Sequence, residues 1–239
     1  GNGSNPYGDC LANKVGRLYR CQECNNNDWE GPLGTVQYYG CGFRAGTVSS
    51  ICGTPMLYLG DIRHDWFYRY DQNPEVETFA GLGFYWGGSC IWDIAEFRYG
   101  EDQYPLLFAG GWRGPSMEYT GRIFSMPQDY CDAVIPDDTV QAFENILEAW
   151  TGDQNWAVES FKGRLYVGSG DNAAGYHGGK LRSSDGGQWP WVLERTWPTT
   201  IQGEGVTALA NQGDKYLYIG LGNPAGGESG EVFPELGSD

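Results

Sequence analysis

The stretch GRLYVGSGDNAAGYHGGKLRSSDGGQWPWV, residues 163–192, decides how the fold is interpreted. It contains a short apolar run, a glycine-rich gap, a second run, an Asp-Gly turn and two tryptophans. Short runs rich in β-branched and aromatic residues, bounded by glycine and Asp-Gly, are typical of antiparallel strands joined by tight turns. The stretch therefore predicts a small antiparallel sheet.

The motif that opens this stretch recurs along the chain, with leading leucines at positions 18, 57, 107, 165 and 217. A short run precedes each copy and another follows it, which gives up to four short strands per repeat. This spacing resembles that of the blades of a β-propeller. The resemblance implies an all-β fold of about five recognisable four-stranded repeats, the last one incomplete. The copies are GRLYRC at 16–21, PMLYLG at 55–60, PLLFAG at 105–110, GRLYVG at 163–168 and KYLYIG at 215–220.

The repeats cover nearly the whole chain, so we expect a single domain over residues 1–239. One segment departs from the pattern, because DDTVQAFENILEAW at 137–150 places four apolar side chains on one helical face. It predicts a short inserted helix over 138–150, capped by Asp138 or Thr139. The repeats themselves fall at approximately 10–46, 47–83, 90–136, 155–197 and 206–239.

The last repeat stops where a fourth strand should begin. An uncovered strand edge is a liability for a protein in solution. We therefore expect the edge of the run GEVF at 230–233 to be covered, either by residues beyond Asp239 or by a strand from another copy. Strand donation of that kind would make the protein a homo-oligomer or polymer.

The turn SSDGGQW at 183–189 resembles the Asp-box of sialidase-, lectin- and sorting-receptor-type propellers. Ser183, Asp185 and Gly187 match that pattern, whereas the threonine is missing and Trp189 comes one residue early. The resemblance implies a structural role, in which Asp185 accepts hydrogen bonds from turn amides and glycine supplies a positive φ. Sialidase activity needs an early Phe-Arg-Ile-Pro stretch, and the nearest run here is GFRAG at 42–46.

Composition limits the partners of the chain. Fifteen basic residues against 31 acidic ones give a formal net charge of −16, which repels nucleic acid and anionic membrane surfaces. No apolar run approaches the length of a membrane span, so we expect a soluble protein without membrane insertion.

All seven cysteines lie in the first 131 residues, which is typical of a secreted or cell-surface protein stapled by disulfides. Their places around the repeats predict bonds between Cys90 and Cys131 and between Cys41 and Cys52, with Cys10 paired to Cys21 or Cys24. One thiol is then left over. The sequon at Asn2 predicts a glycosylation site.

Function has to be argued from sites, because similar folds host enzymes, lectins and scaffolds. We predict no catalytic residue and a binding or structural role, with a glycan or a protein as ligand and a sialidase-like glycoside hydrolase as the alternative. Tryptophans near turns can stack on sugar rings, and the acidic turn at Asp171 and Asn172 offers oxygen ligands for calcium, the candidate cofactor. The tryptophans proposed for ligand binding are Trp86, Trp112, Trp189 and Trp191.

Overall fold

A computed structural model shows an all-β chain, in which every regular element of the described part is a strand. No apolar helix of membrane-spanning length occurs in that part. The described residues are 17–21, 29–35, 43–61, 66–70, 80–83, 90–99, 104–113, 120–126, 144–145, 150–151, 153–171, 178–185, 191–197, 205–222 and 231–235.

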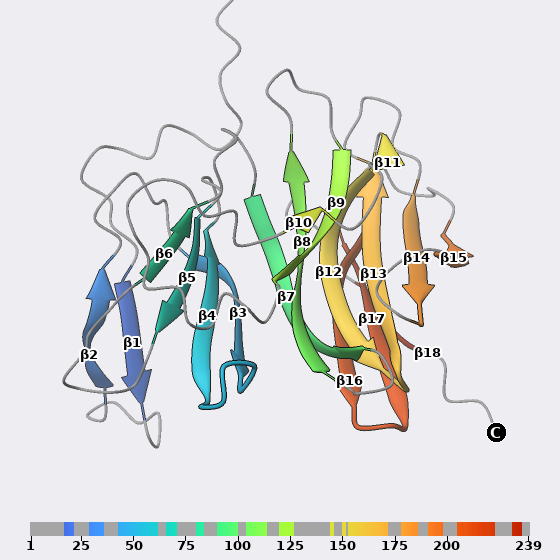
Figure 1. The fold of residues 1–239 in the computed structure, drawn as a ribbon. Coiled ribbons are helices and arrows are strands. Elements are labelled where there is room, and N and C mark those ends of the chain that lie inside the picture. The colour runs from blue at the N-terminus through green and yellow to red at the C-terminus, as the bar shows by residue number, and fades with distance from the viewer. Residues whose placement is uncertain are drawn as a thin grey trace, which may run out of the picture.

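The strands form five separate antiparallel sheets in which neighbours in sequence are neighbours in space (Figure 1). Their bounds are β1 Arg17–Cys21 and β2 Trp29–Thr35; β3 Phe43–Ser49, β4 Met56–Asp61, β5 Trp66–Tyr70 and β6 Ala80–Gly83; β7 Cys90–Tyr99, β8 Tyr104–Arg113, β9 Thr120–Met126, β10 Glu144–Asn145 and β11 Trp150–Thr151; β12 Asp153–Phe161, β13 Arg164–Asp171, β14 Gly179–Ser184 and β15 Val192–Thr196; β16 Gly205–Gln212, β17 Tyr216–Gly222 and β18 Glu231–Glu235.

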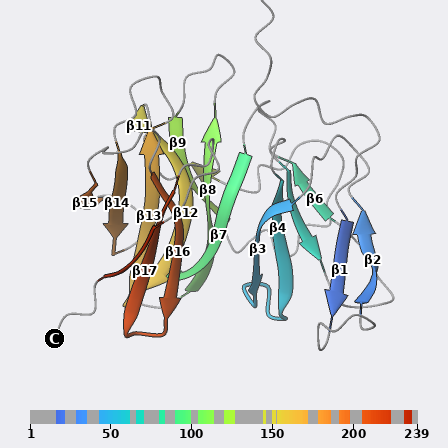
Figure 2. The same ribbon diagram turned by 180° about the vertical axis from the view of Figure 1, so that it is seen from behind.

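The last four sheets pack through their first strands. β3 lies against β7, β7 against β12, and β12 against β16, so sheets that follow one another in sequence are packed on one another. Figure 2 shows the same succession from behind, from the cyan strands to the red ones. We call each contact between two successive first strands, with the side chains around it, a seam.

One local device recurs in these four sheets. Each first strand carries a β-bulge, and the residue after the bulge pairs with the glycine that ends the recurring motif in the second strand. At two of these glycines, a Cβ would lie within 2.4 Å of the next sheet: Gly60 would meet Ile91, and Gly168 would meet Val206. At Gly60 and Gly168 the motif therefore ends in glycine because the first strand of the next sheet comes too close for any side chain. The four pairs are Ala45–Gly60, Asp93–Gly110, Ala157–Gly168 and Ala208–Gly220.

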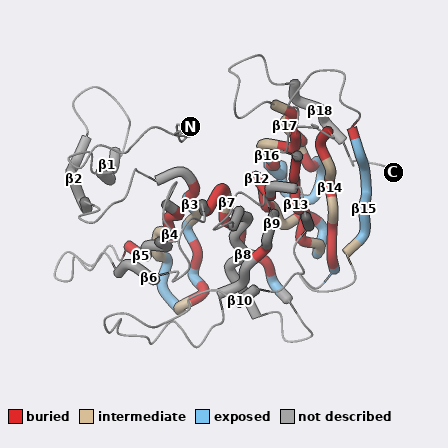
Figure 3. Tube along the Cα trace, turned by 90° about the horizontal axis from the view of Figure 1, so that it is seen from above, coloured by how far each residue is buried: buried red, intermediate tan, exposed pale blue. Residues whose placement is uncertain are grey.

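The core lies in the seams, where two sheet faces meet (Figure 3). One cluster joins β7 and β9 to β12 and β13, and it includes Phe97, Ile123 and Val167. A second joins β12, β13 and β14 to β16 and β17, and it includes Leu181 and Ile219. Burial of each such side chain contributes about 1.5–3 kcal/mol, so these clusters stabilise the packing of one sheet on the next.

The expected β-propeller with Asp-box-like repeats is wrong. The described strands form separate sheets of two, four, five, four and three strands, and no described strand joins the first sheet to the last to close a ring. The recurring motif marks the β-bulge and the glycine that pairs with it. This arrangement requires at most one neighbouring sheet packed against it. A local requirement of that kind carries no information about ring closure.

The expected helix over 138–150 is also wrong where the structure describes this segment. Residues Glu144–Asn145 and Trp150–Thr151 form short strands that pair with β9, placing Glu144 opposite Ser125 and Trp150 opposite Gly121. β9 is at the edge of its core sheet, and its free backbone groups accept these two pairs. Tertiary pairing therefore overrides the helical pattern of apolar residues.

The hairpin between β12 and β13 gives a first prediction. Lys162 and Gly163 form a two-residue turn in which φ is 47° and 73°, a geometry that favours Asn-Gly. Asparagine adopts this positive φ more readily than lysine, but the substitution also removes the contact between Lys162 Nζ and the Phe161 ring. We expect Lys162→Asn to raise the free energy of unfolding by a net amount of about 0.5 kcal/mol. Urea denaturation measures the change. Gly163→Ala, the control, should lower stability by about 1 kcal/mol, and equal effects would contradict the assigned turn.

Candidate functional site

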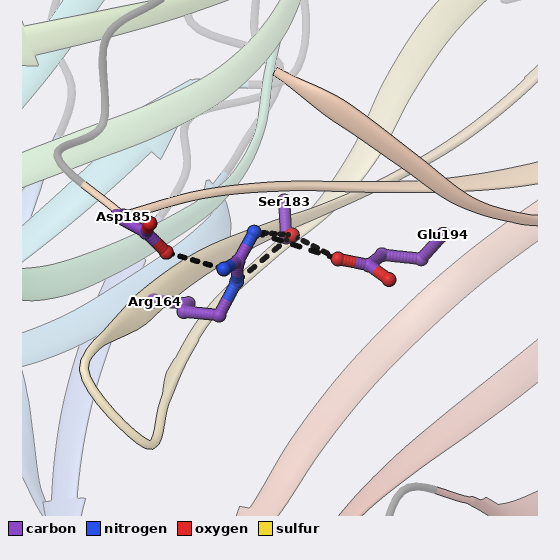
Figure 4. A network of polar contacts seen from close by, with 4 residues as sticks. All are labelled: Arg164, Ser183, Asp185 and Glu194. Carbon is purple, nitrogen blue, oxygen red and sulfur yellow. Dashed lines mark hydrogen bonds and ion pairs between the residues drawn. The ribbon is translucent and has the colours of Figure 1, made fainter. Parts of the chain in front are cut away.

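A polar network lies at one end of the sheet β12–β15 (Figure 4). Arg164 begins β13 directly after the tight turn, Ser183 is near the end of β14, and Glu194 is in the middle of β15. Asp185 follows β14. The antiparallel order of these strands brings the four side chains together, although they are up to 30 residues apart in sequence.

Ser183 is the centre of this network. Its Oγ accepts hydrogen bonds from Arg164 Nε at 3.1 Å and Nη2 at 2.7 Å, and it donates to Glu194 Oε1. Arg164 also forms ion pairs with Asp185 and, at 3.5 Å, with Glu194. The hydroxyl is fully buried, whereas 79% of the Asp185 side chain is exposed.

Tyr166 lies directly across from Ser183 in the β13–β14 pair. Burial raises the pKa of its hydroxyl above the usual range, and the negative charge of Glu194 adds to that effect while Arg164 opposes it. A phenol of this kind stays neutral at physiological pH. It supplies neither a base nor a nucleophile.

The network is therefore suited to holding three strands together. A serine nucleophile needs a free lone pair and a path for the substrate, but Ser183 is buried and its oxygen is occupied by Arg164. The side chains tie β13, β14 and β15 at one end of the sheet.

Two substitutions test this assignment. Ser183→Ala leaves Arg164 and Glu194 without their shared partner and should cost about 1–2 kcal/mol of unfolding free energy. Asp185→Ala removes an exposed ion pair and should cost less than about 1 kcal/mol, with a smaller effect at high salt. Urea denaturation of both variants gives the comparison. A larger loss for Asp185→Ala than for Ser183→Ala would favour the turn-capping role that the sequence predicts for Asp185.

A second group of polar contacts crosses the seams. Ser49 Oγ in β3 donates to Glu96 Oε2 in β7 at 2.6 Å. The backbone N–H of Val158 in β12 donates to Asp93 Oδ2 in β7 at 3.0 Å. In the next seam, Asn211 Nδ2 in β16 donates to Glu159 Oε1 in β12 at 3.1 Å. One carboxylate thus joins each pair of successive first strands.

Asp93 is the most perturbed of these carboxylates. Burial raises its pKa from 3.8 to about 6, although the N–H groups of Val158 and Ile94 stabilise the ionised form, and the charge of Glu159 raises it further. Burial also raises the pKa of Glu159. Both oxygens of Asp93 face backbone amides, because Ile94 N donates to Oδ1 at 2.9 Å. Its position is that of a cap on the free edge of β12.

The structure brings together only part of the predicted site. Ser183 and Asp185 lie in one network, while Gly187, Trp86, Trp189, Asn172 and Asn2 fall outside the described residues. For Trp112 and Asp171 only the strand is described. Trp191 packs against the cluster around Ile123, so its ring is engaged with the core. The described part holds no group of three or more His, Cys, Asp or Glu residues placed for a metal ion.

The predicted disulfide pairs stay predictions. Cys52 is disulfide-bonded, and Tyr58 Oη donates to its Sγ at 3.2 Å. The bonding partner lies outside the described side chains, as do the other six cysteines.

The sequence also holds a signal for Asp93. Asp93 interrupts the apolar run IWDIAEF at a position where the other first strands have Ala45, Ala157 and Ala208. When the four first strands are aligned at their bulges, Asp93 is the charged residue at a position that is otherwise alanine.

Comparison with known proteins adds little. Neither a protein-family model nor a curated protein matches this chain. The crystal structure of an endo-1,4-beta-xylanase from Bacteroides thetaiotaomicron is similar at 15% identity and a TM-score of 0.45, over 80% of this chain and 70% of that one. A likeness this distant supports no statement about fold or activity.

Proposed function

We propose that this chain is a non-catalytic extracellular module that binds a glycan or a protein, or serves as a structural component of a surface. The observation that carries the proposal is the set of contacts made by Asp93, a buried carboxylate whose pKa is raised to about 6. Both its oxygens accept backbone N–H groups, one of them from the neighbouring sheet. The Asp93 carboxylate therefore joins two sheets and has no oxygen directed at a substrate site.

A glycoside hydrolase, the alternative, would need different geometry. Its general acid must present a protonated oxygen to the glycosidic bond, and a second carboxylate must face the sugar from the other side. Asp93 points at β12 rather than at an open site, and Glu159 Oε1 is bonded to Ser160 N and to Asn211. These contacts favour a scaffold over a hydrolase.

The extracellular location is supported by the cysteines. Seven of them lie in the first 131 residues, and Cys52 is disulfide-bonded. Disulfides persist in oxidising compartments.

Two assays on the purified protein test the proposal. Incubation with a panel of aryl glycosides, including xylosides and sialosides, should release no phenol above the buffer blank. A glycan array then separates a lectin, which gives saturable binding to a defined set of sugars, from a protein-binding or structural module, which gives none. If the protein hydrolyses any of these substrates and the Asp93→Asn variant does not, the non-catalytic assignment is refuted.

Completion of the last sheet by another copy is a second candidate, favoured by the sheet order. β18 pairs with β17 on one side, and no described strand pairs with its other side. A strand donated by a second copy would cover that edge. Sedimentation velocity over a tenfold concentration range should then show growing species, and a single species of 26.4 kDa at all concentrations would refute strand donation.

A further inference from the structure

An unusual polar residue lies near the start of β12. It pairs with Ser169, which is on the same face of β13 as Val167 and therefore faces the seam between the sheet of β7–β9 and the sheet of β12–β15. Asn155 in β12 is fully buried, and neither Oδ1 nor Nδ2 has a hydrogen-bond partner among the described residues. A buried amide without partners is strongly unfavourable. Such a group is normally satisfied by the protein or by ordered water.

The equivalent positions in two other first strands are occupied by apolar residues. Asn155 is the residue before the bulge of β12, and the residues before the bulges of β7 and β16 are Ile91 and Val206. Both are buried aliphatic side chains. Asparagine differs from both in carrying a donor and an acceptor that need partners when they are buried.

The residue across from Asn155 is polar as well. Asn155 pairs with Ser169 in β13, whereas Val206 pairs with Leu221 in β17. Ser169 is fully buried, and its Oγ accepts a hydrogen bond from Arg182 Nη1 at 2.9 Å, which leaves the hydroxyl proton to be donated. Side chains directly opposite in an antiparallel pair have Cβ atoms about 5 Å apart, a separation that one water can bridge.

We propose that the Asn155 amide and the Ser169 hydroxyl bind an ordered water molecule in this seam. Water suits the site because it both donates and accepts, as the amide requires, and because Asn155 and Ser169 are both fully buried. Two or more polar partners are what a buried water needs. The polar pair Asn155–Ser169 would then take the place that the apolar pair Val206–Leu221 has in the next sheet, with one water molecule bound between its side chains.

A crystal structure at 1.5 Å or better tests the proposal directly. We expect a water peak about 2.7–3.2 Å from an amide atom of Asn155 and from Ser169 Oγ. In solution, the side-chain NH₂ of Asn155 should give a nuclear Overhauser contact to a long-lived water. A dry site, or an amide bonded only to protein groups, would overturn the proposal.

Melting temperatures give an independent test. If water satisfies the amide, Asn155→Val should not raise the melting temperature by 5 °C or more. If the amide is unsatisfied, removing two unpaired polar groups should raise it by more than about 5 °C, and that result would overturn the proposal. The matched control is Val206→Asn, which places an amide opposite Leu221 without a polar partner. It should lower the melting temperature by more than about 5 °C, showing that the assay detects an unsatisfied amide at an equivalent position.

Discussion

Replacing Gly205 with alanine should lower the free energy of unfolding by about 3 kcal/mol, at the upper end of what overpacking usually costs. A Cβ at this first residue of β16 would lie 1.9 Å from Cζ3 of Trp156 and 2.7 Å from its Cε3. The indole is buried and packs edge-on against Trp92, with ring centroids 6.5 Å apart, so it cannot swing aside freely. Urea denaturation followed by tryptophan fluorescence measures the loss.

Gly222→Ala is the matched control at the end of β17. Its Cβ would meet Thr207 Oγ1 at 3.1 Å and no other atom closer than 3.7 Å. A small rotation of the threonine relieves that contact, so the expected cost is below about 1 kcal/mol. Equal losses in the two variants would show that the tryptophan packing does not restrict Gly205.

Mild acidification should stabilise the protein through Asp93. Its pKa is about 6 in the folded state and 3.8 in a free side chain, so the folded state binds more protons between these values. Stability then falls as pH rises through 6, by about 1.4 kcal/mol between pH 5 and pH 7.5. The stabilisation is fully present below about pH 4 and absent above about pH 7.

Comparison with Asp93→Ala isolates this contribution, because Glu159 shifts in the same direction and remains in both proteins. Alanine is the residue that β3, β12 and β16 carry at the equivalent position. The free energy of unfolding is measured by urea denaturation at pH 5, 6 and 7.5. The variant should be less sensitive to pH by about 1.4 kcal/mol over this range, and an unchanged slope would contradict a buried, proton-binding Asp93.

Sequence reasoning predicted the strands well because their signals are local. The motif ending in Gly60, Gly110, Gly168 and Gly220 located the second strand of four sheets, and the runs around it located β5, β9 and β14. What it did not predict depends on distant partners. Glu144 and Trp150 joined the edge of β9 in place of a helix, and ring closure was inferred from a motif that requires only one packed neighbour.

The candidate site shows the same division. Ser183 and Asp185 were recognised as a turn pattern, but Arg164, which the structure places beside both, belongs to a different hairpin. The contact that explains Asp93 could not be predicted from the sequence, because the Val158 amide is 65 residues away. Local patterns identify which residues are unusual, and the fold alone determines what they contact.

The seams also determine how the molecule opens. Each sheet is built from a continuous stretch of chain, and in the last four sheets the successive first strands β3, β7, β12 and β16 pack on one another. Opening one seam therefore disturbs two sheets and leaves the others packed, as in a stack whose stability is a sum over adjacent layers. β7 and β12 are packed on both sides, whereas β16 ends the described succession. Hydrogen exchange should be slowest in those two inner strands and faster toward β16, so that the array frays from an end rather than melting at its centre.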